Sequence, residues 1–273
     1  VRDASRVAEV LNRVILQAKR QSAPAQINMP RDYWTQVIDI DLPAVVEFER
    51  PAGGEAAIAE AAALLSQARF PVILNDAGVV IGGAIPASIA LAERLDAPVC
   101  VGYQHNDAFP GSHPLFAGPL GYNGSKAAME LISGADVVLC LGTRLNPFST
   151  LPGYALDYWP KTAKIIQVDI NPDRIGLTKK VTVGIVGDAR KVAEAVLARL
   201  ASTAGDHARA ERKAKIAQVK SAWAQALSSM DHEEDDPGTS WNQRARDAKP
   251  DWMSPRMAWR AIQAGLPKEA IIS

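Results

Sequence analysis

Between residues 55 and 200, short and mainly apolar runs alternate with longer segments whose apolar residues recur at helical spacing. The short runs are typical of strands that are buried on both faces, and the helical spacing is typical of amphipathic helices. We expect strands at 71–74, 97–101, 136–141, 164–169 and 181–186, and helices at 55–68, 84–95, 124–133 and 189–200. This alternation predicts a doubly wound α/β fold, in which helices cover both faces of a parallel sheet.

The segments before and after this region have other patterns. Residues 5–19 are predicted to form an amphipathic helix, residues 25–29 a short strand, and residues 31–52 a linker with two prolines. After the sheet region, a helix is predicted from an apolar stripe formed by Ile216, Val219, Trp223, Leu227 and Met230.

The acidic run 232–238 is interpreted as a solvated surface, and 239–252 as a connector. Ser254 and Pro255 predict the start of a helix that Gly265 ends. We therefore divide the chain into residues 1–50, 51–202, 203–252 and 253–273.

The two ends of the sequence suggest a piece of a larger protein. A helical pattern starts almost at Val1, and residues 270–273 resemble the beginning of a buried strand. Such a strand needs a neighbour, because its backbone polar groups require partners. We expect the middle of a longer enzyme, and the alternative is a small protein with irregular ends.

Composition excludes several classes of protein. Hydrophobic residues make up 48% of the 273 residues, so intrinsic disorder is excluded. Thirty basic and thirty acidic residues cancel, which leaves no bulk field for binding nucleic acid or a membrane surface. Two cysteines cannot form a disulfide framework, so we expect a reducing, cytoplasmic setting in which Cys100 and Cys140 are inert core residues.

Candidate chemistry lies where the predicted strands end, because parallel sheets bind ligands beyond the carboxyl ends of their strands. Glycines there allow close approach to a ligand, arginine can bind a phosphate or sulfonate, and an aspartate can accept ribose hydroxyls. The candidates for nucleotide or anion binding are Asn75, Gly78, Gly142, Thr143, Arg144 and Asp169. The dinucleotide fingerprint G-x-G-x-x-G is absent. In the alternative interpretation, the glycines serve turns and Arg144 pairs with a carboxylate.

A long polar segment, 102–123, has no predicted secondary structure, and loops of that length are often functional. His105 in it is a candidate proton carrier, whereas His113 before a proline fits the capping of a turn equally well. No motif for zinc, a nucleophilic serine or a P-loop is present. The residues thus predict a fold and a ligand-binding edge but no catalytic constellation.

Four motifs resemble the central domain of thiamine-diphosphate-dependent enzymes of the acetolactate synthase type: PVILNDAG (71–78), HPLFAG (113–118), ADVVLCLGTR (135–144) and IQVDINP (166–172). Two longer segments resemble the sulfoacetaldehyde acetyltransferase branch of that family: 102–126 and 145–154. The resemblance implies a Rossmann-like central domain at 51–202. It also implies that 1–50 ends a pyrimidine-binding domain, 203–252 is a helical linker, and 253–273 begins a diphosphate-binding domain.

The same resemblance implies that the residues that activate thiamine diphosphate and hold Mg²⁺ lie outside this sequence, so this chain alone is expected not to catalyse the reaction. The loop 102–126 would lie near an active-site funnel, where Tyr103, Gln104, His105 and Asn123 would shape substrate access. Relatives form dimers or tetramers and sometimes hold a flavin or a nucleotide in the central domain.

The implied reaction converts sulfoacetaldehyde and phosphate to acetyl phosphate and sulfite, in taurine and sulfonate degradation. One alternative is an acetolactate-synthase-like or glyoxylate-condensing enzyme that releases carbon dioxide. The other is a stand-alone nucleotide-binding module that uses Arg144 and Asp169.

Overall fold

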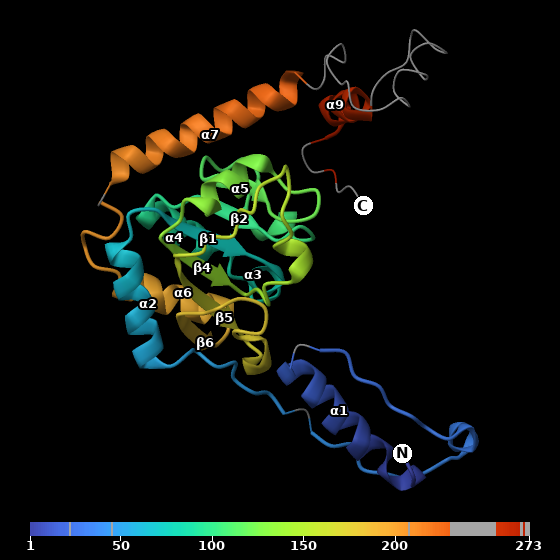
Figure 1. Cartoon of the computed structure of the whole chain (residues 1–273). Coiled ribbons are helices and arrows are strands. Elements are labelled where there is room, and N and C mark those ends of the chain that lie inside the picture. Colours follow the sequence, from blue (N-terminus) through green and yellow to red (C-terminus); the bar gives the residue numbers. More distant parts are fainter. Residues whose placement is uncertain (22, 45, 207, 230–254, 268–269, 271–273) are drawn as a thin grey trace, which may run out of the picture. The chain divides into compact units, whose positions relative to one another are not determined.

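The computed structural model describes the chain except residues 22, 45, 207, 230–254, 268–269 and 271–273. The chain divides into two compact units, Val1–Ile216 and Ala217–Ser273, and each is described by itself. The first unit contains a layered α/β domain whose sheet lies at its centre (Figure 1).

All strands of this sheet are parallel, and their order is β3-β2-β1-β4-β5-β6. Strands β2 and β3 therefore extend the sheet from β1 in one direction, and strands β4, β5 and β6 extend it from β1 in the other. The strands are β1 (Pro71–Asn75), β2 (Val99–Val101), β3 (Phe116–Pro119), β4 (Val137–Leu141), β5 (Lys164–Asp169) and β6 (Val183–Val186). The prediction of a doubly wound parallel α/β fold is confirmed.

Helices pack on both faces of the sheet because successive strand residues point to opposite faces. The core on one face joins strand residues such as Ile73 and Ile166 to α2 (Glu55–Gln67), α4 (Ile85–Leu95) and α6 (Ala189–Arg199). On the other face, the buried thiol of Cys100 contacts the carbonyl of Ala128 in α5 (Lys126–Ser133) at 3.7 Å. A short helix, α3 (Ala77–Ile81), directly follows β1.

The sheet has one strand more than the sequence pattern predicts. Strand β3 and the 3-10 turn η3 (Asn106–Ala108) lie inside the segment 102–123, which was expected to lack secondary structure. That expectation is wrong because β3 is short and contains Gly118 and Pro119, which give no strand signal. An edge strand tolerates proline, and β3 pairs only with β2, with a shift in register.

The amino-terminal segment forms helix α1 (Val7–Gln21), preceded by η1 (Ala4–Arg6) and followed by η2 (Arg31–Thr35). The predicted amphipathic helix is confirmed. The predicted strand at 25–29 is wrong, because these residues have no regular structure. Among the described residues no strand pairs with them, and an extended segment without a ladder is not a strand.

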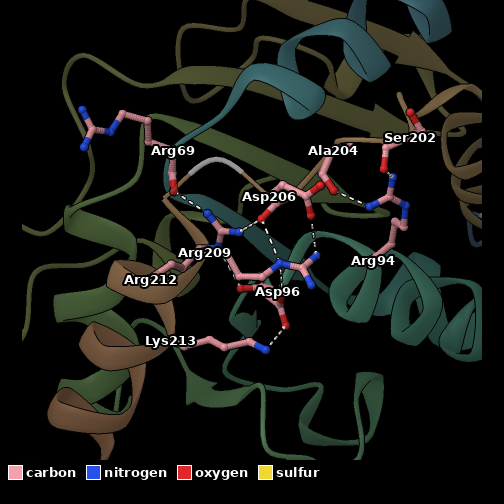
Figure 2. Close-up of polar contacts among 10 residues, drawn as sticks. Arg69, Arg94, Asp96, Ser202, Ala204, Asp206, Arg209, Arg212 and Lys213 are labelled. Atoms are coloured by element: carbon pink, nitrogen blue, oxygen red, sulfur yellow. Dashed lines mark hydrogen bonds and ion pairs between the residues drawn. The ribbon is translucent and has the colours of Figure 1, made fainter.

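The start of α7 (Arg209–Ser229) is anchored to the α/β domain by a buried arginine. Arg212 is 1% exposed and donates to the backbone carbonyls of Asp96 (3.1 Å), Arg69 (2.6 Å) and Gly205, as Figure 2 shows. Arg209 and Lys213 add ion pairs to the Asp96 carboxylate at 2.9 and 3.4 Å. Carbonyls at the end of α4 and before β1 are thereby satisfied by a side chain from α7.

The second unit contains the rest of α7 and α9 (Pro255–Gly265), so both predicted helices are confirmed. Met230, the acidic run 232–238, the connector 239–252, the cap at Ser254 and most of the terminal strand lie outside the described residues. Two further 3-10 turns are η4 (Pro147–Ser149) and η5 (Pro172–Arg174). None of the helices in the described ranges is both long and apolar enough to cross a membrane.

Candidate functional site

A cleft of about 250 Å³ lies beyond the carboxyl ends of the strands. It opens beside β1 and β4, where the strand order reverses, because the connections from these two strands leave in opposite directions. Four of the six candidates for nucleotide or anion binding line it: Gly78, Gly142, Arg144 and Asp169. The cleft therefore lies at the strand ends, where ligand binding was expected.

Gly78 and Gly142 hold the loops after β1 and β4 against each other. The Gly78 amide donates to the Gly142 carbonyl at 2.8 Å. A Cβ atom on Gly78 would lie 2.6 Å from the Gly142 backbone, and one on Gly142 would lie 2.7 Å from that of Gly78. The close approach that glycine permits here is thus between two loops of the chain, as the turn interpretation expected.

Asn75 and Thr143 lie beneath the cleft and do not line it. The fully buried Asn75 amide donates to the Ser88 hydroxyl (2.8 Å) and to the Ala108 carbonyl (3.0 Å). The Thr143 hydroxyl donates to the Asp76 carboxylate at 2.7 Å, and the same carboxylate accepts the Ala77 amide at 2.9 Å. These two candidates therefore satisfy buried polar groups that support the floor of the cleft.

Three arginines and three aspartates line the cleft: Arg50, Arg144, Arg174, Asp76, Asp169 and Asp188. Burial raises the pKa of Asp169, which is 5% exposed, and this effect outweighs the Asn171 amide at 2.8 Å and the positive charges of Arg174 and Arg144. Within the described part of the chain, neither Arg144 nor Arg174 forms an ion pair or a hydrogen bond through its guanidinium group.

The loop candidates separate into two groups. Gln104 and His105 line the cleft, and the His105 ring lies 3.7 Å from the Asp76 carboxylate and 3.8 Å from that of Asp107. Tyr103 packs on the Phe148 ring with centroids 6.1 Å apart. Asn123 is exposed with φ of 56°, a conformation that asparagine tolerates in turns. Neither Tyr103 nor Asn123 lines the cleft.

The other histidine of this loop has a local role. His113 accepts the Leu115 amide at 3.2 Å and packs edge-on against the Phe109 ring, with centroids 5.0 Å apart. This arrangement matches the turn-capping alternative for His113. Cys100 and Cys140 are buried, and burial raises the pKa of both thiols, as expected for inert core residues.

Sequence reasoning missed Arg50, Arg174 and a second role of Asp188. Asp188 was predicted to cap the last helix, and it does accept the Arg190 and Lys191 amides at 3.0 and 3.2 Å. Its place in the cleft was not predicted. Arg174 follows the end of β5 closely, so the strand-end rule could have found it. No signal in the sequence indicates Arg50, since the prediction placed it in a linker.

The described residues contain no cluster of three or more histidine, cysteine, aspartate or glutamate side chains that could hold a metal ion. The described residues therefore offer no carboxylate cluster that would fit Mg²⁺.

The sequence matches the family described as thiamine pyrophosphate enzyme, central domain, over residues 58–196. This match covers half of the chain, and the chain belongs to that family. It is 79% identical to sulfoacetaldehyde acetyltransferase of Roseovarius nubinhibens and 73% identical to sulfoacetaldehyde acetyltransferase of Rhodobacter capsulatus, in both cases over the whole chain.

The fold is similar to that of a solved structure, benzoylformate decarboxylase from Polynucleobacter necessarius, with a TM-score of 0.61 and 24% sequence identity. That similarity covers 73% of this chain and 37% of the decarboxylase chain, and it supports the fold alone. The chain spans 45% and 46% of the lengths of the two acetyltransferases, so it corresponds to about half of each.

Proposed function

We propose that this chain is the middle part of a sulfoacetaldehyde acetyltransferase, which converts sulfoacetaldehyde and phosphate to acetyl phosphate and sulfite. The observation that carries the proposal is the 79% identity to such an enzyme over all 273 residues. The proposal includes thiamine diphosphate and Mg²⁺ as cofactors, held by residues elsewhere in the protein. It also includes assembly as a homodimer or homotetramer and a cytoplasmic role in taurine degradation.

In this proposal the α/β domain at 51–202 is a scaffold that connects parts contributed by residues 1–50 and 253–273. The loop residues Tyr103, Gln104, His105 and Asn123 shape access to the substrate. Support comes from the length of the similarity, which covers all 273 residues and therefore includes these loops.

The test is an assay of a full-length protein that contains this sequence, supplied with thiamine diphosphate and Mg²⁺. Sulfite and acetyl phosphate are expected to form in equal amounts from sulfoacetaldehyde and phosphate. Carbon dioxide release from pyruvate or glyoxylate, without sulfite, would instead favour the acetolactate-synthase-like alternative.

His105 can be tested in the same assay. His105→Ala should lower kcat/KM for sulfoacetaldehyde by about tenfold or more if the ring contacts substrate or orients it. His113→Ala is the matched control, because this second histidine of the same loop packs on Phe109 and faces Glu93. Unchanged turnover of His105→Ala would remove His105 from the substrate-access residues.

The arginines of the cleft favour a second, compatible function for this domain, the binding of a nucleotide or another phosphoryl anion. Guanidinium groups without ion-pair partners at a sheet edge suit such a ligand. Titration of this chain with ADP, FAD and CoA tests it by calorimetry. Saturable micromolar binding would support a ligand site. The absence of binding would indicate that the domain has a structural role only.

A further inference from the structure

Residues 49–52 come from the predicted linker, and together with Gly53 they are part of the α/β domain. Ala52 and Gly187 form an antiparallel bridge, and the Asp188 amide donates to the Pro51 carbonyl at 2.8 Å. Lys191 contacts the Glu49 carboxylate and donates to the Arg50 carbonyl at 3.1 Å. Gly53 has φ of 86°, and a Cβ atom there would lie 2.8 Å from Ile185, so the segment lies close against β6 and α6.

Arg50 extends from this segment into the cleft. Its Nη1 atom donates to Asp188 Oδ2 at 3.0 Å, and the other oxygen of that carboxylate accepts the first amides of α6. The Asp188 side chain is 7% exposed, whereas that of Arg50 is 40% exposed. A guanidinium group carries five N–H donors, and in the described structure only Nη1 of Arg50 is hydrogen-bonded. Arg50 can therefore keep Asp188 and bind an anion with its remaining donors.

The hydrogen-bond donors left over in the cleft favour an anion at this place. Each of its three aspartates already accepts a donor from the protein: Asp76 from Ala77 and Thr143, Asp169 from Asn171, and Asp188 from Arg50, Arg190 and Lys191. Arg144 and Arg174 have no ion pair or guanidinium hydrogen bond among the described residues. The guanidinium groups of the cleft therefore keep N–H donors that an anion can accept, whereas the carboxylates already accept donors of the protein.

The amides at the start of α3 are not available for such a ligand. The Ala77 amide donates to Asp76, and the Gly78 amide donates to Gly142. Binding of a phosphoryl group would therefore depend on guanidinium groups more than on backbone amides.

We propose that Arg50 is an anion-binding residue of the cleft and couples occupancy of the cleft to the attachment of residues 49–53. This inference rests on the phosphoryl-anion site proposed above. An anion that engages Arg50 while Asp188 holds it adds one more contact across the junction between residues 49–53 and α6. Because binding and attachment are linked, the anion strengthens the attachment, and the attached segment preorganises Arg50 for the anion.

The experiment compares wild-type chain with Arg50→Ala, Arg50→Lys and Arg199→Ala. Arg199 is the matched control, since its side chain is also 40% exposed and ion-paired, to Glu55, but does not line the cleft. Calorimetry with inorganic phosphate, pyrophosphate and ADP measures affinity. Arg50→Ala is expected to weaken binding by about tenfold or more, because a charge-assisted hydrogen bond is lost, with Lys intermediate and Arg199→Ala unchanged.

The three probes distinguish the source of the phosphoryl group. Comparable affinity for pyrophosphate and ADP would indicate that the diphosphate is recognised, whereas binding of phosphate alone would indicate a free anion. Either pattern of affinities supports the proposal, provided that Arg50→Ala weakens the binding of the anion that the wild-type chain binds.

Hydrogen exchange supplies a second readout, and its first comparison uses only the wild-type chain. Pyrophosphate at saturation should slow exchange in peptides that cover 48–53 and 185–191 of the wild-type chain, and Arg50→Ala should abolish that slowing. Equal affinity of Arg50→Ala and wild type, or exchange unaffected by bound pyrophosphate, would overturn the role of Arg50 and leave the cleft site standing. No binding of any probe to the wild type would overturn both, while sulfite release by the full-length enzyme would be unaffected.

Discussion

At the scale of single residues, the clearest constraint is the contact between the loops after β1 and β4. Gly142 has φ of 62° and faces the Gly78 backbone, so both its conformation and its lack of a side chain matter. Gly83 also has φ of 62°, but no atom lies within 4 Å of a Cβ built there. A comparison of alanine substitutions at Gly83 and Gly142 therefore separates the cost of a left-handed conformation from the cost of a steric clash.

We predict that Gly83→Ala lowers the free energy of unfolding by about 1 kcal/mol, the cost of a left-handed alanine. Gly142→Ala should cost roughly 2 to 4 kcal/mol, because the two loops must also move apart. Urea denaturation of both variants measures the difference. Equal losses would show that the contact between the loops relaxes at no cost.

Asp169 gives a prediction on pH dependence. Burial raises the pKa of Asp169 above its ordinary value of 3.8, so the folded protein holds this proton more tightly than the unfolded chain. The contribution of Asp169 to stability therefore falls as pH rises from the unfolded pKa through the folded pKa, and stays low above it. Asp169→Asn should raise Tm relative to wild type more at pH 7 than at pH 4.

Thermal melts at several pH values check this expectation. Asp173→Asn is the control, because it also removes a negative charge near the same strand end but at an exposed position. A Tm difference for Asp169→Asn that is the same at pH 4 and pH 7 would contradict the assignment.

At the scale of elements, α7 is joined to the α/β domain through side-chain donors to backbone carbonyls. These carbonyls lie at the ends of elements, where no ladder or helix satisfies them. Arg212 supplies donors to three of them from one buried position. One buried side chain thus joins the start of α7 to three points of the α/β domain.

We predict that Arg212→Met lowers the free energy of unfolding of the α/β domain by about 3 kcal/mol or more. It removes the donors to the Asp96 and Arg69 carbonyls and one of the two described donors to the Gly205 carbonyl. Lys213→Met should cost under about 1 kcal/mol, since the Lys213 side chain is 58% exposed and Asp96 keeps its ion pair with Arg209. Chemical denaturation followed by circular dichroism compares the two. A small effect at Arg212 would mean that water replaces its donors.

At the scale of the whole molecule, the chain contains an α/β domain with a cleft at its strand ends and spans about half of the length of its acetyltransferase relatives. The described residues hold no metal-binding cluster. We predict that this chain, given thiamine diphosphate, Mg²⁺, sulfoacetaldehyde and phosphate, releases no sulfite above background. The full-length protein in a parallel assay is the positive control. Turnover by the chain alone would contradict the proposal that the residues that bind the cofactor lie outside this chain.

The sequence by itself determined the α/β class, the five strands with strong apolar runs, the helices between them and the family resemblance. These follow from local patterns, because burial on both faces imposes apolar residues on neighbouring positions. The strand predicted at residues 25–29 is not formed, and strand β3 was not predicted. In both places, strand formation depends on a neighbouring strand. An apolar run without a partner strand is not a strand, and a partnered edge segment needs no apolar run.

The tertiary structure alone decided how the candidates are used. Asn75 and Thr143 form buried hydrogen bonds below the cleft. Gly78 and Gly142 form a contact between two loops. Arg50 and Arg174 line the cleft together with Arg144. The physical reason is that a site at strand ends gathers residues far apart in the sequence. Their side-chain directions depend on hydrogen bonds that form only when the loops meet.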